Sequence, residues 1–204
     1  YSYLRYRVYV SFIEGIVFMN NKAIIDYEYS NEFEGFIEDN IGKIENIAHE
    51  IVSEYVHSDV AIVHDEDETT FVTFGVGARE MNAPEGMYKR FEISMSASKD
   101  TLTDKQTFLI ANELVKISKF PFRNKTWLGP FHTINASEEF SKEFGFHYFL
   151  FDVLGEYDNS VVVLKCIPVY EDEYTTICST QAGSIDFLEK YYDAFILDDN
   201  VFGR

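Results

Sequence analysis

The sequence predicts an α+β fold, with a single domain in which a mixed or mostly antiparallel β-sheet is packed by about three to four α-helices. Apolar residues follow helical spacing at 30–56, 103–119 and 184–195. These segments alternate irregularly with runs of strand-forming residues. A doubly wound parallel sheet requires a regular alternation of strands and helices, so the α+β interpretation is favoured.

The composition limits the classes of protein to be considered. A chain of 204 residues that is 46% hydrophobic fits one folded domain with a substantial core. Two cysteines, Cys166 and Cys178, do not make a disulfide framework, and no run approaches the roughly 20 apolar residues of a membrane span. We therefore expect a cytoplasmic protein without cofactor or metal, whose oligomeric state the sequence does not indicate.

The charge is strongly acidic. Seventeen Lys and Arg residues face thirty-five Asp and Glu residues, which gives a net charge of −18. Residues 138–199 hold fourteen acidic and three basic residues, so −11 of that charge lies there. Nucleic acid and anionic membranes require cations on the protein, so a basic protein partner is favoured over both. Solubility is the competing explanation of the charge.

The chain divides into an extended segment at 1–29 and a domain at 30–204. Residues 3–29 are rich in Tyr, Val, Ile and Phe, and Asn20-Asn21 predicts a turn between two extended pieces. From residue 30 the spacing predicts a long helix up to about residue 56, capped by Ser30 or Asn31. Gly35 and Gly42 weaken this helix.

An antiparallel meander is expected next, from extended segments at 59–64, 69–76 and 88–95. The acidic run 65–68 predicts the first turn. Thr73 and Gly75 lie near the end of the second strand, where glycine permits a turn or a bulge. In the third strand, apolar residues alternate with polar ones, which predicts one buried face and one solvent-facing face.

A second helix begins at Thr103 with Gln106 at the capping-box position, and it is expected to end at Pro121. The stretch 118–134 then combines Gly129-Pro130 with many apolar residues and predicts a structured turn that enters an extended segment.

The C-terminal third predicts a hairpin and a helix. Apolar runs at 146–153 and 161–169 flank the turn signal 155–159, and the run 161–164 lacks polar alternation, which is typical of a central strand covered on both faces. Ser184 is expected to cap a last helix.

Three segments, taken in order, carry a family resemblance. They are Phe71-Val-Thr-Phe-Gly-Val-Gly77, a helix that runs into an aromatic-Pro segment followed by Gly129-Pro-Phe-His-Thr133, and an apolar strand that ends in Pro168-Val-Tyr-Glu-Asp-Glu173. This ordered set resembles the Suppressor of Fused domain family over roughly residues 50–195. The residues that carry the motifs are Thr73, Gly75, Pro121, Trp127, Gly129, Pro130, His132, Pro168 and Tyr170.

The resemblance implies a protein-binding domain and not an enzyme. Animal members of the family sequester a transcription factor by capturing a short peptide, with strand addition between two halves of the protein. Bacterial single-domain members resemble immunity proteins that neutralise a toxin encoded beside them. This chain is similar to the bacterial kind, because it has no room for the second half that grips the peptide.

We therefore expect an immunity or antitoxin protein that binds a basic, nuclease-type toxin through an acidic surface. By resemblance, Asp59 matches a family segment that contributes to the partner-binding cleft, although capping a turn is a competing role. The residues expected to contact the partner are Asp59, Glu156, Asp158, Glu171, Asp172 and Glu173. The alternatives are a regulatory module that captures an extended peptide by β-strand addition, and a hydrolase that uses His132.

Other sites are disfavoured by geometry. His57 and Asp59 would share one face of a strand while His64 points the other way, which is a poor arrangement for a metal. The cations Lys116, Lys119, Arg123 and Lys125, interleaved with aromatic residues, are too few in so acidic a chain to predict nucleic-acid binding. His132 lies in a turn-rich segment, where hydrogen bonding to a backbone carbonyl is the competing role.

Overall fold

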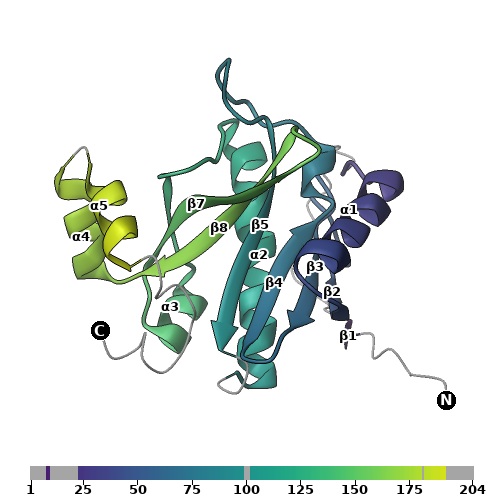
Figure 1. The fold of residues 1–204 in the computed structure, drawn as a ribbon, viewed down its shortest axis with the longest axis horizontal. Coiled ribbons are helices and arrows are strands. Elements are labelled where there is room, and N and C mark those ends of the chain that lie inside the picture. Colours follow the sequence, from purple (N-terminus) through teal and green to yellow (C-terminus); the bar gives the residue numbers. More distant parts are fainter. Residues whose placement is uncertain (1–7, 10–22, 99–101, 181, 192–204) are drawn as a thin grey trace.

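A computed structural model describes residues 8–9, 23–98, 102–180 and 182–191, which form one mixed sheet with helices on both faces (Figure 1). The α+β single-domain fold is confirmed. The described strands are β1 (Val8–Tyr9), β2 (Ile44–His49), β3 (Asp59–His64), β4 (Glu68–Phe74), β5 (Arg90–Ser98), β6 (Thr133–Asn135), β7 (Tyr148–Tyr157) and β8 (Val161–Val169). The described helices are α1 (Tyr27–Asn40), α2 (Asp104–Asn124), α3 (Glu138–Phe144), α4 (Glu171–Ser179) and α5 (Gly183–Tyr191), with a 3-10 turn η1 (Val76–Ala78).

The eight described strands follow the order β1-β2-β3-β4-β5-β8-β7-β6. The β3-β4-β5 meander and the β7-β8 hairpin are antiparallel, as the sequence predicts. They meet at the parallel pairing of β5 with β8, where Arg90 lies opposite Val161. The N-terminal meander and the C-terminal hairpin therefore share one continuous sheet. Most of the extended segment expected at 3–29 lies outside the described residues.

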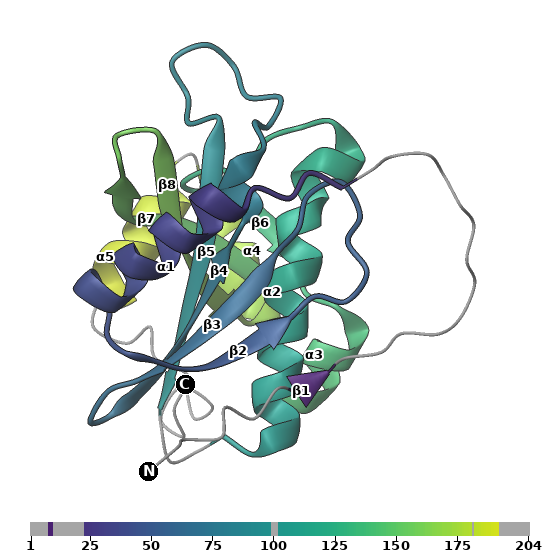
Figure 2. The same ribbon diagram turned by 90° about the vertical axis from the view of Figure 1, so that its right-hand side faces the viewer.

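Alternate side chains of the sheet point to two separate helical layers. On one face α2 packs against a core that includes Phe71, Phe91 and Ile93. On the other face α1 packs on β3, β4 and the start of β8. On that face α4 and α5 cover the start of β7 and the end of β8. Figure 2 shows α1 and α2 on opposite sides of the sheet. The residues 161–164 are buried on both faces, which confirms the prediction of a central strand.

The prediction of a single helix at 30–56 is wrong at both ends. Asp26, not Ser30 or Asn31, is the N-cap of α1, and its carboxylate accepts from the Tyr29 amide at 3.0 Å. The helix stops at Asn40, because Gly42 takes a φ of +146° and the chain turns into β2. The isoleucines of 44–51 fit helical spacing, but they are β-branched and favour a strand once the helix is broken.

Pro121 does not end α2, contrary to the expectation. The capping box of Thr103 and Gln106 is confirmed, but the helix continues to Asn124 and stops only at Lys125, which has a φ of 52°. Proline removes one backbone hydrogen bond from a helix. Burial of the next residue, Phe122, whose ring stacks on Phe91 at 6.3 Å, compensates for that loss.

The β7-β8 hairpin turns later than the sequence indicates. Asp158 and Asn159 both have a φ of 51°, as the tight turns of hairpins require. Gly155 lies within β7, beside a shift of register between Val153 and Gly155, so it marks a bulge and not the turn. Gly75 does turn the chain after β4, with a φ of +103°, and a Cβ there would lie 2.9 Å from the carbonyl oxygen of His57.

The solvent-facing side expected for β5 is in fact buried by α1. Glu92 is 0% exposed, and its carboxylate accepts from the Tyr29 hydroxyl at 2.8 Å, the Thr73 hydroxyl at 2.6 Å and the Gly77 amide at 2.8 Å. Burial raises the pKa of Glu92 to about 7 and outweighs these hydrogen bonds, which lower it. This carboxyl group connects α1, β4, β5 and η1.

The raised pKa makes stability depend on pH. The folded protein binds the Glu92 proton more tightly than the unfolded chain, so the stabilisation is complete below about pH 4.5 and is lost as pH rises through about 7. Relative to Glu92→Gln, the wild type should lose up to about 3 kcal/mol of unfolding free energy between pH 5 and pH 8. Urea unfolding at several pH values measures this difference. Glu45→Gln, on an exposed strand position, is the control, and parallel profiles for wild type and Glu92→Gln would contradict the prediction.

Candidate functional site

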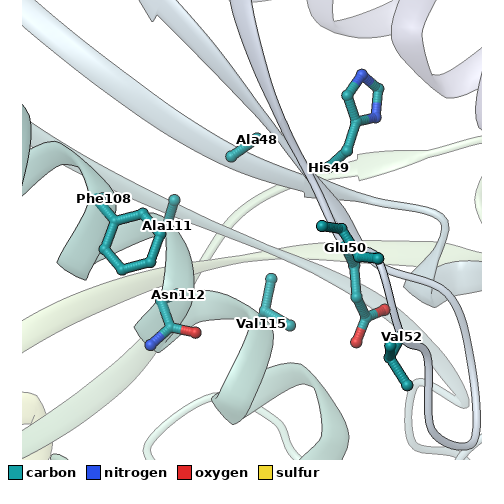
Figure 3. A pocket seen from close by; sticks show the side chains of 9 residues that line it. Ala48, His49, Glu50, Val52, Phe108, Ala111, Asn112 and Val115 are labelled. Atoms are coloured by element: carbon teal, nitrogen blue, oxygen red, sulfur yellow. The ribbon is translucent and has the colours of Figure 1, made fainter. Parts of the chain in front are cut away.

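A narrow groove lies between β2 and α2 (Figure 3). Its volume is about 130 Å³, and its walls are mostly apolar. Ile51, Val52 and Phe108 are 48%, 72% and 37% exposed, which is high for large apolar side chains. The lining residues are 48–52 from β2 and the segment after it, and Phe108, Ala111, Asn112 and Val115 from α2. The groove lies beside the outer part of the sheet.

A cluster of ionisable side chains, made of His49, Glu50, His57, Asp59 and Lys119, underlies one end of this groove, and all of them except His49 are largely buried. Lys119 is 3% exposed, and its ammonium group donates to the Glu50 carboxylate at 2.9 Å and also to the Val56 carbonyl. Burial lowers the pKa of Lys119, and the charge of Glu50 opposes that shift. The cluster joins α2 to the segment after β2 through charges that are largely removed from water.

Asp59 lies at the start of β3 and is already held within the chain. It is 7% exposed, and its carboxylate meets His57 at 3.0 Å, His49 at 2.9 Å and the Glu50 amide at 2.8 Å. Burial raises the pKa of Asp59, but the hydrogen bonds from these groups outweigh it, so the net pKa is lowered. A partner that contacts the Asp59 carboxylate must displace one of the histidines.

His57 bridges Asp59 and Ser53. The Ser53 hydroxyl lies 2.7 Å from Nδ1 of His57 and also donates to Glu50 at 2.9 Å. These contacts have the connectivity of a hydrolase triad. The hydrogen bond to Asp59 raises the pKa of His57, and burial opposes that shift. The Ser53 hydroxyl has one proton, and because it donates that proton to Glu50, its oxygen is left to accept from His57.

His132 lies in a different part of the molecule, packed edge-on against Trp127 with ring centroids 4.2 Å apart. Burial lowers its pKa, and a backbone hydrogen bond at Trp127 opposes that shift. In the described part of the chain no carboxylate forms an ion pair with it. Its backbone amide donates to Gly129, and Phe131 has a φ of 65°, so Gly129, Pro130 and His132 together shape a tight turn before β6.

The acidic residues expected to contact a partner fall into two groups at opposite ends of the sheet (Figure 1). Glu171, Asp172 and Glu173 form the first turn of α4, after Pro168 in β8 and the N-cap Tyr170. Glu156 and Asp158 lie at the tip of the β7-β8 hairpin, where Tyr157 packs on Phe33 and Phe36 of α1 with ring centroids 5.2 Å apart in both pairs. The sequence does not indicate this separation.

The hairpin tip instead lies beside acidic residues at the start of α1, which the sequence analysis did not assign to a contact surface. Tyr157 donates to Glu32 at 3.5 Å, and Asp26 and Glu28 line the same small depression as Asp158. These residues are about 130 positions apart in the chain, so only the packing of Tyr157 against α1 brings them together.

The four cations weighed for nucleic-acid contact lie on or just after α2. Lys119 is buried against Glu50, Lys116 pairs with Glu139 at 3.0 Å, and Arg123 approaches Glu54 at 3.8 Å. Lys125 terminates the helix. Within the described residues, no group of three or more His, Cys, Asp or Glu side chains has a geometry that could hold a metal, and no helix is long and apolar enough to cross a membrane.

Removing one partner of the buried ion pair should strongly destabilise the protein. Lys119→Met leaves the Glu50 carboxylate buried without its cation, and we expect a loss of about 3–5 kcal/mol in unfolding free energy. Arg123→Met, on the same helix but in an exposed pair, should cost less than about 1 kcal/mol. Urea unfolding measures both. The prediction would be contradicted if the two variants lost equal free energy of unfolding. It would also be contradicted if adding Glu50→Gln to Lys119→Met restored none of the lost free energy.

Comparison with known proteins identifies a family. The family model described as Suppressor of fused protein (SUFU) matches residues 54–198, which is more than half of the chain. The match includes β3 to α5 and with them Asp59 and Lys119, but not His49 or Glu50. A search of curated proteins finds no relative.

Proposed function

Because the chain belongs to the Suppressor of fused protein (SUFU) family, whose domain is a protein-interaction module, we propose that it binds a basic protein partner without catalysing a reaction. The partner is a toxin domain of the nuclease type, and the protein acts as a bacterial immunity protein that neutralises it. A nuclease must present a cationic surface to its substrate, so an acidic protein that covers this surface competes with nucleic acid directly.

The proposal rests on one observation: among the described residues, charged side chains form ion pairs on one face of the sheet but not on the other. On the α2 side the cations are neutralised locally, as Lys105 pairs with Glu143, Lys116 with Glu139 and Lys142 with Glu138. On the other side, α1 contains no Lys or Arg, and in the described part of the chain none of its acids forms an ion pair. The acids of this side are Asp26, Glu28, Glu32, Glu34, Glu38 and Asp39 of α1 and its N-cap, and Asp158 of the hairpin. Glu156 points away from α1, because its neighbour Tyr157 packs on that helix, and it accepts from the Tyr88 hydroxyl.

An unneutralised acidic face has a kinetic use. It attracts a cationic partner over a distance of about 10 Å at moderate salt and raises the rate of association. It also disfavours acidic partners, which gives specificity at little cost in contact area. Both properties suit a protein that must intercept a toxin before the toxin reaches nucleic acid.

The competing function, capture of an extended peptide, is favoured by the groove between β2 and α2. Within the described residues β2 pairs with β1 only at Ala48 and His49, and a peptide strand that adds to this edge would pair with the preceding residues of β2. The exposed side chains of Val52 and Phe108 would receive apolar residues of such a peptide. Asp59 would act there as a positioning residue that orients His49 at the groove.

Charge reversal tests the proposed function. The full chain is used as bait in a native lysate, and we expect it to retain a stoichiometric basic protein at low salt and to release most of it at high salt. Glu156→Lys with Asp158→Lys should weaken this binding at least about tenfold, because two attractive charges become repulsive. Glu171→Lys with Asp172→Lys applies the same change of charge at α4 and tests the other acidic group. Retention of the partner by both variants with unchanged affinity would refute an acidic contact surface.

A substitution in the groove separates the two functions. Phe108→Asp places a charge on the apolar wall and should abolish binding of an extended peptide selected from a peptide array, while it leaves capture of a basic protein unchanged. Asn112→Asp, one turn along α2, is the control for the added charge. Loss of the basic partner on Phe108→Asp, with no loss on Asn112→Asp, would move the conclusion to peptide capture.

A further inference from the structure

Helix α1 is attached to the sheet by a narrow contact. Three of its fourteen residues, Tyr29, Phe33 and Ile37, are buried. On the opposite face, nine of the twenty-one residues of α2 are buried. Elements with few buried apolar contacts open locally at a lower cost in free energy than the rest of a fold. Of these two helices, α1 is therefore the one that opens at the lower cost.

The polar contact beneath α1 is the carboxyl group of Glu92. The Tyr29 hydroxyl donates to its Oε1 atom at 2.8 Å, and the Gly77 amide donates to the same atom at 2.8 Å. A second hydrogen bond at the helix, from the Tyr157 hydroxyl to Glu32, is 3.5 Å long and exposed to solvent. A long bond with which water competes contributes little. Glu92 therefore supplies the stronger polar attachment of α1.

A negative charge on Glu92 would have no counter-ion. The side chain is fully buried, and within the described residues it forms no ion pair. Arg90, two residues away in β5, donates through Nε to the Gly77 carbonyl, and its guanidinium carbon lies 5.1 Å from the ring centroid of Tyr29. A buried carboxylate without an ion pair is costly, whereas the neutral acid is much less so. The position thus favours a protonated Glu92.

The neutral acid also fits the hydrogen bonds around it. Oε2 of Glu92 lies 2.6 Å from Oγ1 of Thr73, and this hydroxyl oxygen accepts from the Ile93 amide at 2.8 Å. A hydroxyl oxygen has two acceptor sites, so Thr73 can also accept from a protonated Oε2. Tyr29 and Gly77 continue to donate to Oε1. Protonation therefore leaves the attachment of α1 intact, and ionisation places an unpaired charge beneath the helix.

The neighbouring ionisable groups come from α1, the β7-β8 hairpin and α2. Tyr29 faces Glu92 from α1 and Tyr157 adjoins Tyr29, and burial raises the pKa of both hydroxyls. Lys119 lies across the sheet on α2, where it forms a buried ion pair. Val163 of β8, which lies opposite Glu92, is apolar. Burial raises the pKa of Glu92 to about 7, so of these groups it is the one placed to change its charge near neutral pH.

We propose that Glu92 forms a pH-sensitive switch for α1, in which the protonated carboxyl group holds the helix on the sheet and ionisation favours its release. Water reaches the carboxyl group once α1 is released, so the open state ionises at a lower pH than the closed state. A rise in pH from about 5 to neutral therefore favours opening, and the effect levels off once the closed state has also ionised. Release uncovers Val72, Phe74 and Val163 of the sheet and removes the acids of α1 from the acidic face. The switch does not depend on what the acidic face binds.

Hydrogen–deuterium exchange of the full chain tests the switch, measured by mass spectrometry between pH 5 and pH 8 and corrected for the intrinsic exchange rate. In the wild type we expect the opening constant of amides 33–37 in α1 to rise up to about 70-fold over this range. Amides 110–117 of α2 should show a much smaller change. An equal rise in α1 and α2 would indicate global unfolding and overturn the proposal, as would the absence of a rise in α1.

Two substitutions of glutamate by glutamine assign the effect to one side chain. Glu92→Gln keeps the shape of the side chain but does not ionise, so its opening constant for α1 should be the same at pH 5 and pH 8. Glu38→Gln makes the same substitution at an exposed position of α1 and should keep the wild-type pH dependence. A wild-type profile in Glu92→Gln, or a flat profile in Glu38→Gln, would refute the assignment to Glu92.

A third variant tests the connection to the helix without changing Glu92. Tyr29→Phe removes only the hydroxyl that joins α1 to the carboxyl group. At pH 8 it should raise the opening constant of α1 about tenfold, the usual value of one hydrogen bond to a charged group, and leave α2 unchanged. An unchanged opening constant for α1 would show that Glu92 does not hold the helix and would overturn the proposal.

Discussion

The burial of Glu92 is the constraint on which the arrangement of the α1 side depends. A carboxyl group in the centre of a sheet requires donors, and the three that it finds come from α1, β4 and η1. The Tyr29 hydroxyl is the donor from α1, so this hydrogen bond helps to hold the helix against β5. Once α1 is placed, its exposed acids face the same side as the β7-β8 hairpin, and the acidic face follows.

On the α2 side the buried ionisable group is a cation, Lys119. Lys119 is carried into the interior by α2, and Glu50 and the Val56 carbonyl receive it from the segment between β2 and β3. The two networks lie on opposite faces of the sheet, and each connects a helix to strands through a group that is costly to bury alone. The narrow groove between β2 and α2 is thus bounded by a helix that buried polar contacts hold in place.

Sequence reasoning was reliable where one local pattern decided the structure. The strands at 59–64 and 161–169 are dense in β-branched residues, and the capping box at Thr103 is a local hydrogen-bond pattern, so all three were predicted. It failed at 41–56, because isoleucines at three- and four-residue intervals fit the period of a helix, and only Gly42 marks the break. At Pro121 the local rule was overridden by the burial of Phe122.

The candidate sites were less predictable than the fold. Family resemblance drew attention to Asp59, but its partner His49 and the neighbouring Lys119 could not be assigned, since Lys119 meets Glu50 across 69 residues of chain. Glu92 looked like a solvent-facing strand residue, and nothing local indicates that α1 covers it. Long-range contacts of this kind leave no periodic signal in a sequence.

The parallel pairing of β5 with β8 has a consequence for how the protein is made. More than 60 residues separate the two strands, so during synthesis the meander and α2 are complete before the hairpin leaves the ribosome. In that interval β5 is an edge strand whose backbone lacks its final partner, and such edges invite pairing with other chains. Contacts of high sequence separation also form slowly. The hairpin that delivers Asp158 to the acidic face is therefore also the segment that closes the sheet, and an interrupted or slowly elongating chain would be vulnerable to aggregation until the hairpin is made.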